Sequence, residues 1–128
     1  MLDHVSLGVG NLATSRAFYD AALKPLGCRR VYDLDMLSGY GASADKPAFW
    51  IAGPEALERN AVPSAGSHVA FAAESRAAVD AFYAAALAAG GRDNGEPGLR
   101  PEYHESYYGA FVLDPDGHHV EAVCHRPE

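Results

Sequence analysis

The stretch that decides the fold occurs twice: DHVSLGVGNLATSRAFYDAALKPLG at residues 3–27 and SHVAFAAESRAAVDAFYAAALAAGG at residues 67–91. The two copies align without a gap, and ten of their twenty-five positions are identical. His4 of the first copy is matched by His68 of the second. A repeat of this kind predicts two similar units that pack on each other, because one unit alone rarely buries its apolar face.

Each copy begins with the pattern of a strand and continues with that of a helix. Apolar residues alternate with polar or small ones over residues 4–9, which predicts a strand with His4 pointing away from the apolar side. The helices that follow are expected to begin after Asn11 and Ser75, whose side chains can cap them. We expect the first helix to end at Lys24–Gly27 and the second at Gly90–Gly91.

The segments after each helix read as strands and turns. The sequence predicts a single α+β domain over residues 1–128, with one module at about 1–53, a joint at about 54–66 and a second module at about 67–126. The expected pieces are a strand from Cys28, a turn at Ser38–Gly41, a strand at Ala48–Ala52, a polar loop at Arg92–Arg100, and a hairpin of Ala110–Leu113 with His118–Cys124 around a turn at Asp114–Gly117.

Composition excludes several classes of partner. The net charge of -7 and the isoelectric point near 5.2 disfavour nucleic acid, because the protein repels phosphate backbones. The amino-terminal segment has no basic region before an apolar run, and no stretch is long enough to span a bilayer, so we expect a soluble, cytoplasmic protein without a membrane partner. Cys28 and Cys124 fit reduced thiols better than a disulfide, although a bridge between them stays open.

Three residues form a candidate metal site. His4 and His68 occupy matched positions on the first strands of two related units, so pairing of the units can bring them together. Glu121 lies inside the last strand and can complete the set. Two imidazoles and a carboxylate hold a divalent ion and leave coordination positions open. The alternative is a pair of strand histidines hydrogen-bonded to backbone and a solvent-exposed glutamate.

The repeated unit, the strand openings HVSLGV and HVAFAA, the two FY helices and the ending DPDGHHVEAV resemble the vicinal oxygen chelate superfamily. This superfamily includes glyoxalases, extradiol dioxygenases and bleomycin or fosfomycin resistance proteins. The resemblance covers nearly the whole chain and implies two paired βαβββ modules whose curved mixed sheet forms a cup around a divalent metal. It also implies that His4, His68 and Glu121 are the ligands.

Two positions depart from the named activities. The resemblance to glyoxalase I implies an acidic fourth ligand within PAFWIAG, where this chain has Trp50, so strict glyoxalase I activity is doubtful. Trp50 is expected to wall an apolar pocket or to pack in the core. The extradiol dioxygenase signature is matched at His104, at DPDG and at Glu121, but Phe111 stands where that signature has a tyrosine.

Titratable side chains gather just before the final hairpin. We expect His104, Tyr107 and Tyr108 to move protons or to donate to a developing oxyanion. The substrate pocket is expected to include Trp50, Tyr103, Phe111 and His119, of which His119 shares a strand face with Glu121. A tyrosine-rich surface loop is the alternative interpretation.

The sequence therefore predicts a glyoxalase-like enzyme that uses a divalent ion of iron, manganese, nickel or zinc. Its expected chemistry is that of a lyase, an isomerase or a dioxygenase acting on a small molecule with two vicinal oxygens. The competing hypothesis is a non-catalytic binding or resistance protein of the same fold. A homodimer is implied by the resemblance.

Overall fold

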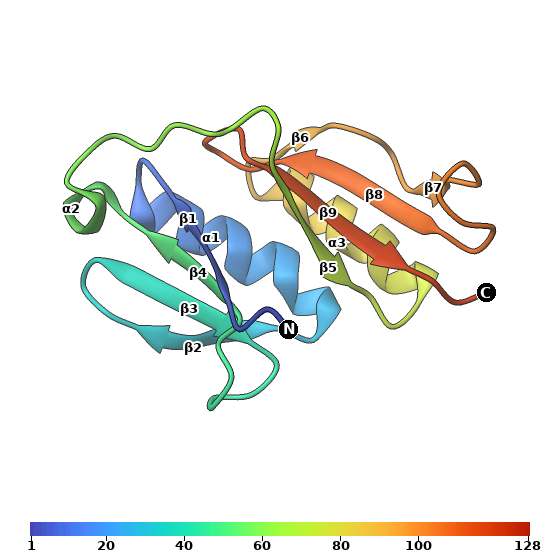
Figure 1. Cartoon of the computed structure of the whole chain (residues 1–128), viewed down its shortest axis with the longest axis horizontal. Helices are drawn as coiled ribbons and strands as arrows, with labels where there is room; N and C mark the ends of the chain where they lie inside the picture. The colour runs from blue at the N-terminus through green and yellow to red at the C-terminus, as the bar shows by residue number, and fades with distance from the viewer.

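Two modules with the same order of strands and helices follow each other in the computed structural model, which describes residues 1–128. The first module contains β1 (Val5–Gly8), α1 (Leu12–Leu23), the 3-10 turn η1 (Lys24–Leu26), β2 (Arg29–Asp33), β3 (Leu37–Gly41) and β4 (Phe49–Ala52). The second contains β5 (His68–Ala72), α3 (Arg76–Ala88), β6 (Arg92–Asp93), β7 (Gly98–Leu99), β8 (Tyr108–Leu113) and β9 (His119–Cys124). The short helix α2 (Pro54–Leu57) lies in the connection between them (Figure 1).

The predicted caps start both long helices. Asn11 Oδ1 accepts a hydrogen bond from the Thr14 amide at 3.0 Å, and Ser75 Oγ accepts one from the Ala78 amide at 3.1 Å. These bonds satisfy amide groups that have no partner within the first helical turn. Gly27 closes η1 with a φ of 79°, a conformation that favours glycine.

Each module builds one mixed sheet, which confirms the predicted α+β class. The first sheet has the order β1-β4-β3-β2 and the second β5-β9-β8-β6, with β7 also paired to β8. In both sheets the first strand is parallel to the last strand of its module, and the other pairs are antiparallel. The two sheets share no strand pair, so β1 and β5 each keep one unpaired edge.

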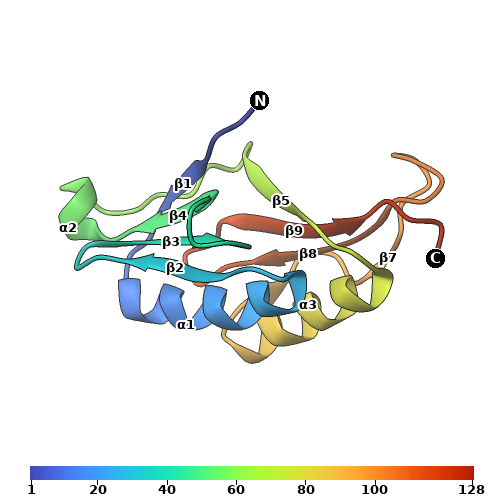
Figure 2. The same cartoon turned by 90° about the horizontal axis from the view of Figure 1, so that it is seen from below.

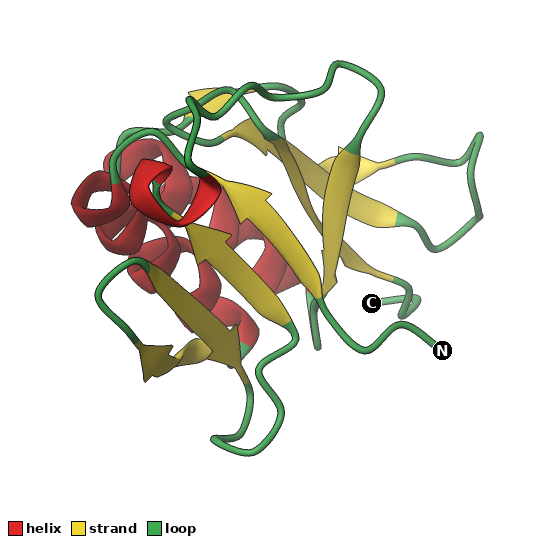
Figure 3. Cartoon of the chain, turned by 60° about the vertical axis from the view of Figure 1, so that its left-hand side comes forward, coloured by secondary structure: helices red, strands yellow, loops and turns green.

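Helices α1 and α3 join the modules. They lie side by side beneath the two sheets in Figure 2, and Figure 3 shows them gathered on one side of the molecule. The repeat-matched residues Phe18 and Phe82 are fully buried in one core shared by both modules. Above the helices, Phe49 of β4 meets Phe71 of β5 edge to face, with ring centroids 5.1 Å apart.

The pairing of α1 with α3 sets the directions of the first strands. In Figure 1, β1 runs upward from the amino terminus, whereas β5 runs downward. His4, directly before β1, lies beside the middle of β5, where it lines a small cavity with Val69, Ala70 and Phe71. His68 is the first residue of β5 and does not line that cavity. This geometry decides which of the predicted ligands can meet within one chain.

The predicted turn at Ser38–Gly41 is wrong, because these residues lie in β3. The turn comes earlier, where the Leu34 amide donates to the Leu37 carbonyl at 2.9 Å. Tyr40 explains the difference, since it is buried and its hydroxyl donates to Asp20 of α1 at 2.9 Å. Two glycines in the segment favoured a turn by local preference, but tertiary packing holds it as a strand.

Two further segments differ from the sequence expectation. The loop expected at residues 92–100 contains the two-residue strands β6 and β7, and the connection between the modules contains α2. Elements this short carry too few residues for a periodic signal. The predicted hairpin around Asp114–Gly117 is confirmed, with Gly117 at a φ of 95°. Cys28 and Cys124 are free thiols, and no helix has the length and apolar character needed to cross a membrane.

A buried polar contact ties the hairpin turn of the second module to the first module. Asp114 is fully buried and accepts a hydrogen bond from the Tyr19 hydroxyl of α1 at 2.6 Å. It also accepts from the amides of Asp116 and His118, both at 2.9 Å. The His118 imidazole donates to the Gly8 carbonyl at the end of β1 at 2.6 Å. The turn is therefore a structural connection between the modules.

Replacing Asp114 with alanine should lower the free energy of unfolding by about 3 kcal/mol, because the buried Tyr19 hydroxyl and two partly buried amides lose their acceptor. Urea denaturation followed by circular dichroism measures the change. The matched control is Asp35→Ala, which removes an exposed carboxylate that makes no hydrogen bond or ion pair. A loss below about 0.5 kcal/mol for Asp114→Ala would contradict this role.

Candidate functional site

A buried carboxylate marks the candidate site. Glu121 lies in the middle of β9 and is only 1 % exposed. Its Oε2 accepts a hydrogen bond from the hydroxyl of Tyr107, the residue that precedes β8. Burial of an ionised carboxylate is costly unless it has partners, so this pair indicates that the position of Glu121 is specified.

His68 is the second partner of Glu121. Strands β5 and β9 are parallel neighbours, with His68 opposite His119 and Ala70 opposite Glu121. This register brings His68 Nε2 to 3.3 Å from Glu121 Oε1. The His68 side chain is 57 % exposed, so the pair is open to solvent on the imidazole side.

Gly109 leaves the space that this arrangement needs. A Cβ atom at Gly109 would lie 3.2 Å from Tyr107 Cε1 and 3.4 Å from Glu121 Oε2. A side chain there would press on the phenol and the carboxylate together. The absence of a side chain at this β8 position lets Tyr107 reach Glu121.

A cavity of about 250 Å³ opens beside His68. It includes the predicted pocket residues Tyr103, Phe111 and His119. Asn94 Nδ2 donates to His119 Nδ1 at 3.1 Å, which leaves the other ring nitrogen of His119 available. The cavity combines aromatic walls with several hydrogen-bonding groups, as sites for small molecules usually do.

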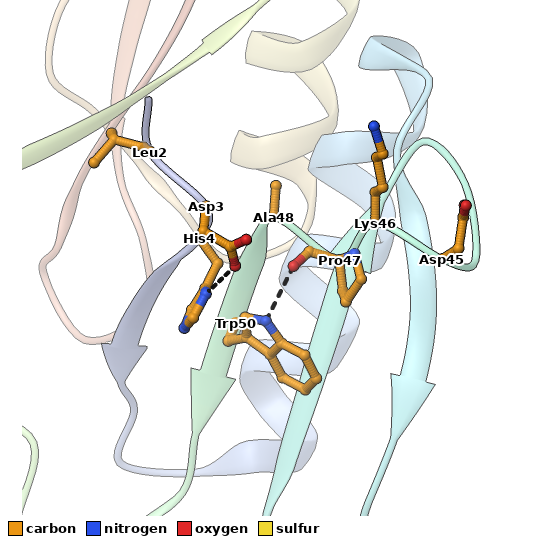
Figure 4. Close-up of a pocket in the computed structure, with 8 residues that line it drawn as sticks. All are labelled: Leu2, Asp3, His4, Asp45, Lys46, Pro47, Ala48 and Trp50. Atoms are coloured by element: carbon orange, nitrogen blue, oxygen red, sulfur yellow. Dashed lines mark hydrogen bonds and ion pairs between the residues drawn. The ribbon is translucent and has the colours of Figure 1, made fainter.

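His4 and Trp50 lie in a different cavity, of about 630 Å³. His4 Nδ1 donates to Asp3 Oδ1 at 2.7 Å. Figure 4 shows Trp50 on β4 and His4 directly before the neighbouring strand β1, with both rings on the same side of the sheet. Trp50 thus lines a cavity other than the one beside His68, and its place in a substrate pocket stays a prediction.

One chain brings together two of the three predicted ligands. No group of three or more histidine, cysteine, aspartate or glutamate side chains is placed to hold a metal ion. His68 and Glu121 supply an imidazole and a carboxylate, a donor pair that suits iron, manganese, nickel or zinc. His4 lines other cavities than the one beside His68. The assignment of all three as ligands stays a prediction.

The predicted proton-transfer residues separate into two groups. Tyr107 contacts Glu121, whereas Tyr108 points toward α3, where its hydroxyl donates to Asp80 at 2.7 Å. The exposed His104 accepts from the Ser106 amide at 3.1 Å and lies against His125, with ring centroids 5.7 Å apart. Of these three residues, only Tyr107 therefore joins the Glu121 site.

Asn94 and Arg100 are site residues that the sequence analysis missed. Asn94 orients His119, and the Arg100 guanidinium lies 5.3 Å from the centre of the Phe111 ring. Both belong to the segment expected to be a plain polar loop. The only available signal was that this loop precedes the tyrosine-rich stretch and could fold back on the hairpin.

The Glyoxalase/Bleomycin resistance protein/Dioxygenase superfamily matches residues 1–122 of this chain. A glyoxalase/bleomycin resistance protein from Albidiferax ferrireducens T118 is similar in structure, with 36 % sequence identity, a TM-score of 0.82 and 98 % of each chain covered. No curated protein matches the chain.

More distant structures share the fold. A glyoxalase-related enzyme from Fulvimarina pelagi has 21 % identity and a TM-score of 0.72, with 97 % of this chain and 87 % of that chain covered. Lactoylglutathione lyase from Agrobacterium tumefaciens has 19 % identity and a TM-score of 0.66, with 97 % and 92 % covered. At these identities the likeness concerns the architecture alone.

The hydrogen bond from Tyr107 to Glu121 should be detectable in the pH dependence of the protein's stability. Burial, followed by the hydrogen bond to Glu121 and the negative charge of that carboxylate, raises the pKa of Tyr107 above its ordinary value. The folded state therefore holds the phenolic proton more tightly than the unfolded state does. This contribution to stability is fully present below pH 10 and is lost as the pH rises through the pKa of the folded state.

Tyr107→Phe should lower the free energy of unfolding at pH 8 by about 1 kcal/mol, because Glu121 loses its buried donor. The difference from wild type should narrow as the pH rises above 10, because ionisation of the Tyr107 phenol in the unfolded wild-type chain stabilises its unfolded state, whereas the variant has no phenol at this position. Urea denaturation between pH 8 and pH 11 measures both effects. Tyr103→Phe, at an exposed hydroxyl, is the control, and a difference that widens with pH would contradict the assignment.

Proposed function

The chain belongs to the Glyoxalase/Bleomycin resistance protein/Dioxygenase superfamily, and from this premise we propose that it is a metal-dependent enzyme acting on a small, vicinally oxygenated molecule. Its reaction would be of the lyase, isomerase or dioxygenase type. The observation that carries the proposal is the contact between His68 and the buried Glu121, which joins two potential metal donors at an open cavity.

The two donors are held in different ways. Glu121 is buried and fixed by Tyr107, so one carboxylate oxygen is engaged and the other faces His68. The His68 imidazole is more than half exposed and can turn its Nε2 toward an ion. A fixed carboxylate with an adjustable imidazole suits a catalytic site, where a hydrogen-bonded outer group orients the ligand.

The third donor would come from a second copy of the chain. His4 is exposed directly before β1 and His68 is exposed at the start of β5, and both strands have an unpaired edge. In a two-fold symmetric homodimer, β1 of one copy can approach β5 of the other, because a two-fold interface repeats each contact reciprocally. Two equivalent sites would result, each with His68 and Glu121 from one copy and the partner's His4.

The residues around the pair have roles that follow from their contacts. A bound divalent ion would supply Lewis acidity toward substrate oxygens. His119, oriented by Asn94, can accept or donate a proton in the cavity beside His68. Tyr103 and Phe111 would form aromatic walls against the substrate. The cavity of about 250 Å³ limits the part of the substrate held there to a small group.

Metal content tests the ligand assignment. Protein purified without chelator should hold about one equivalent of divalent ion per chain by plasma mass spectrometry. His68→Ala and His4→Ala should each lose most of the ion. Glu74→Ala, which removes an exposed carboxylate paired with Arg126, is the control and should keep it.

Mixing the two variants tests whether the site is shared between copies. A heterodimer of His4→Ala and His68→Ala chains contains one intact site, so random re-mixing should restore about one quarter of the wild-type metal content. If each chain carried a complete site, mixing would restore none. Restored metal without turnover of thiohemiacetals, catechols or other vicinal oxygen compounds would overturn the enzyme proposal.

A binding or resistance protein of the same fold is the second candidate. The larger cavity beside His4 and Trp50 favours it, because an aromatic replaces an acidic residue at the edge of a roomy pocket. Binding of a small molecule that persists after complete removal of metal by a chelator, with no turnover, would favour this function. Loss of binding on chelation would favour the enzyme.

A further inference from the structure

The indole of Trp50 lies flat on the sheet in a fixed orientation. Its Nε1 donates to the Pro47 carbonyl at 3.1 Å (Figure 4). Gly39 is the neighbour of Trp50 on β3, and a Cβ atom there would lie 2.9 Å from two carbons of the indole. The ring can cover the strand only because position 39 has no side chain.

Three residues that lie opposite one another on neighbouring strands form a row across the first sheet. Gly39 is paired with Trp50 on one side and with Tyr32 on the other. The Tyr32 and Trp50 rings lie 5.6 Å apart at 38°. Phe49 and Ile51, the neighbours of Trp50 along β4, are buried in the core, so the Trp50 ring lies on the opposite face of the sheet.

A cavity that borders Trp50, but not Tyr32 or Gly39, carries acidic side chains. Asp3, His4 and Trp50 are among its lining residues, and Asp3 accepts from His4. Asp45 and Lys46 line it as well, so with neutral histidine the cavity carries a net negative charge. The whole chain has a net charge of -7. An anion approaching Trp50 would therefore be repelled.

We propose that Trp50, Gly39 and Tyr32 form a stacking platform for a planar aromatic ligand of neutral or positive charge. The platform is fixed before binding, because a hydrogen bond and a glycine hold the indole in place, so little conformational entropy is lost when a ring stacks on it. Aromatic faces attract both aromatic rings and cations, and the nearby carboxylates favour a positive charge.

If the protein has the proposed function, the ring bound by the platform would be the aromatic part of the substrate. This identification rests on the proposed function, whereas the platform itself does not. His4 lines the cavity beside Trp50, so a metal site containing His4 would border the platform. Stacking itself requires neither metal nor turnover. Failure of the platform and failure of the enzyme proposal are therefore distinguishable in metal-free protein.

Calorimetric titration of metal-free protein with N-methylquinolinium, quinoline and quinoline-2-carboxylate tests the platform. Saturable binding is expected for the first two probes, with the cation tightest and the carboxylate at least about tenfold weaker. Trp50→Leu should lower the affinity for the cation by about tenfold or more, since stacking of a ring on an aromatic side chain contributes on the order of 1–3 kcal/mol to binding. Because Trp50 is the only tryptophan, quenching of its fluorescence should follow the same isotherm.

Two further variants separate the contributions. Gly39→Ala places a methyl group under the indole and should weaken the binding of N-methylquinolinium and of quinoline by the same factor. Asp3→Asn should weaken only the binding of the N-methylquinolinium cation. Tyr83→Phe, on a partly buried tyrosine whose hydroxyl donates to Asp93 in the second module, is the control and should leave probe binding unchanged. Urea denaturation verifies that each variant is folded.

Three results would overturn the platform. These are absence of saturable binding for all probes, equal affinity in Trp50→Leu, and tightest binding of the carboxylate. Saturable binding by the monomer alone, with Trp50 shielded from acrylamide in the dimer, would overturn it as well, because it would assign this face to contact between two copies of the chain.

Discussion

The packing of α1 against α3 is the constraint on which the rest of the structure depends. Phe18 and Phe82, at matched positions of the repeat, share one core, so the two modules are related by an approximate two-fold axis. That axis makes β1 and β5 run in opposite directions and leaves one edge of each unpaired. The helices thus hold the chain together, while the histidine-bearing strands stay available for contacts outside it.

The two modules have diverged in what they place on their sheets. At the Glu121 site, the second module buries a carboxylate and holds it with Tyr107 and His68. The first module has no such carboxylate and presents Trp50 above Gly39 instead. A repeated backbone therefore supplies two different surfaces, one suited to an ion and oxygen atoms and the other to an aromatic ring. In the proposed homodimer these surfaces would meet.

Local patterns predicted the repeat, the helices, their caps and the final hairpin, because each depends on residues close in sequence. The turn at Ser38–Gly41 was wrong because contacts of Tyr40 with α1 outweighed the local preference of the glycines. His68 was a candidate because of its position in the repeat, and Glu121 because it lies within the last strand. The structure places these two side chains in contact. The distance of His4 from that pair could not be predicted, since it depends on the relative direction of the two modules, and Asn94 gave no local signal.

The central claim is that His68 and Glu121 of one copy and His4 of another form a single metal site. Anomalous diffraction from a crystal of the metal-loaded protein tests this most directly, because it locates the ion and identifies the element. The account predicts one peak per chain, at coordination distance from His68 and Glu121 and from the partner copy's His4. A peak bound by residues of one chain alone, or one remote from Glu121, would contradict it.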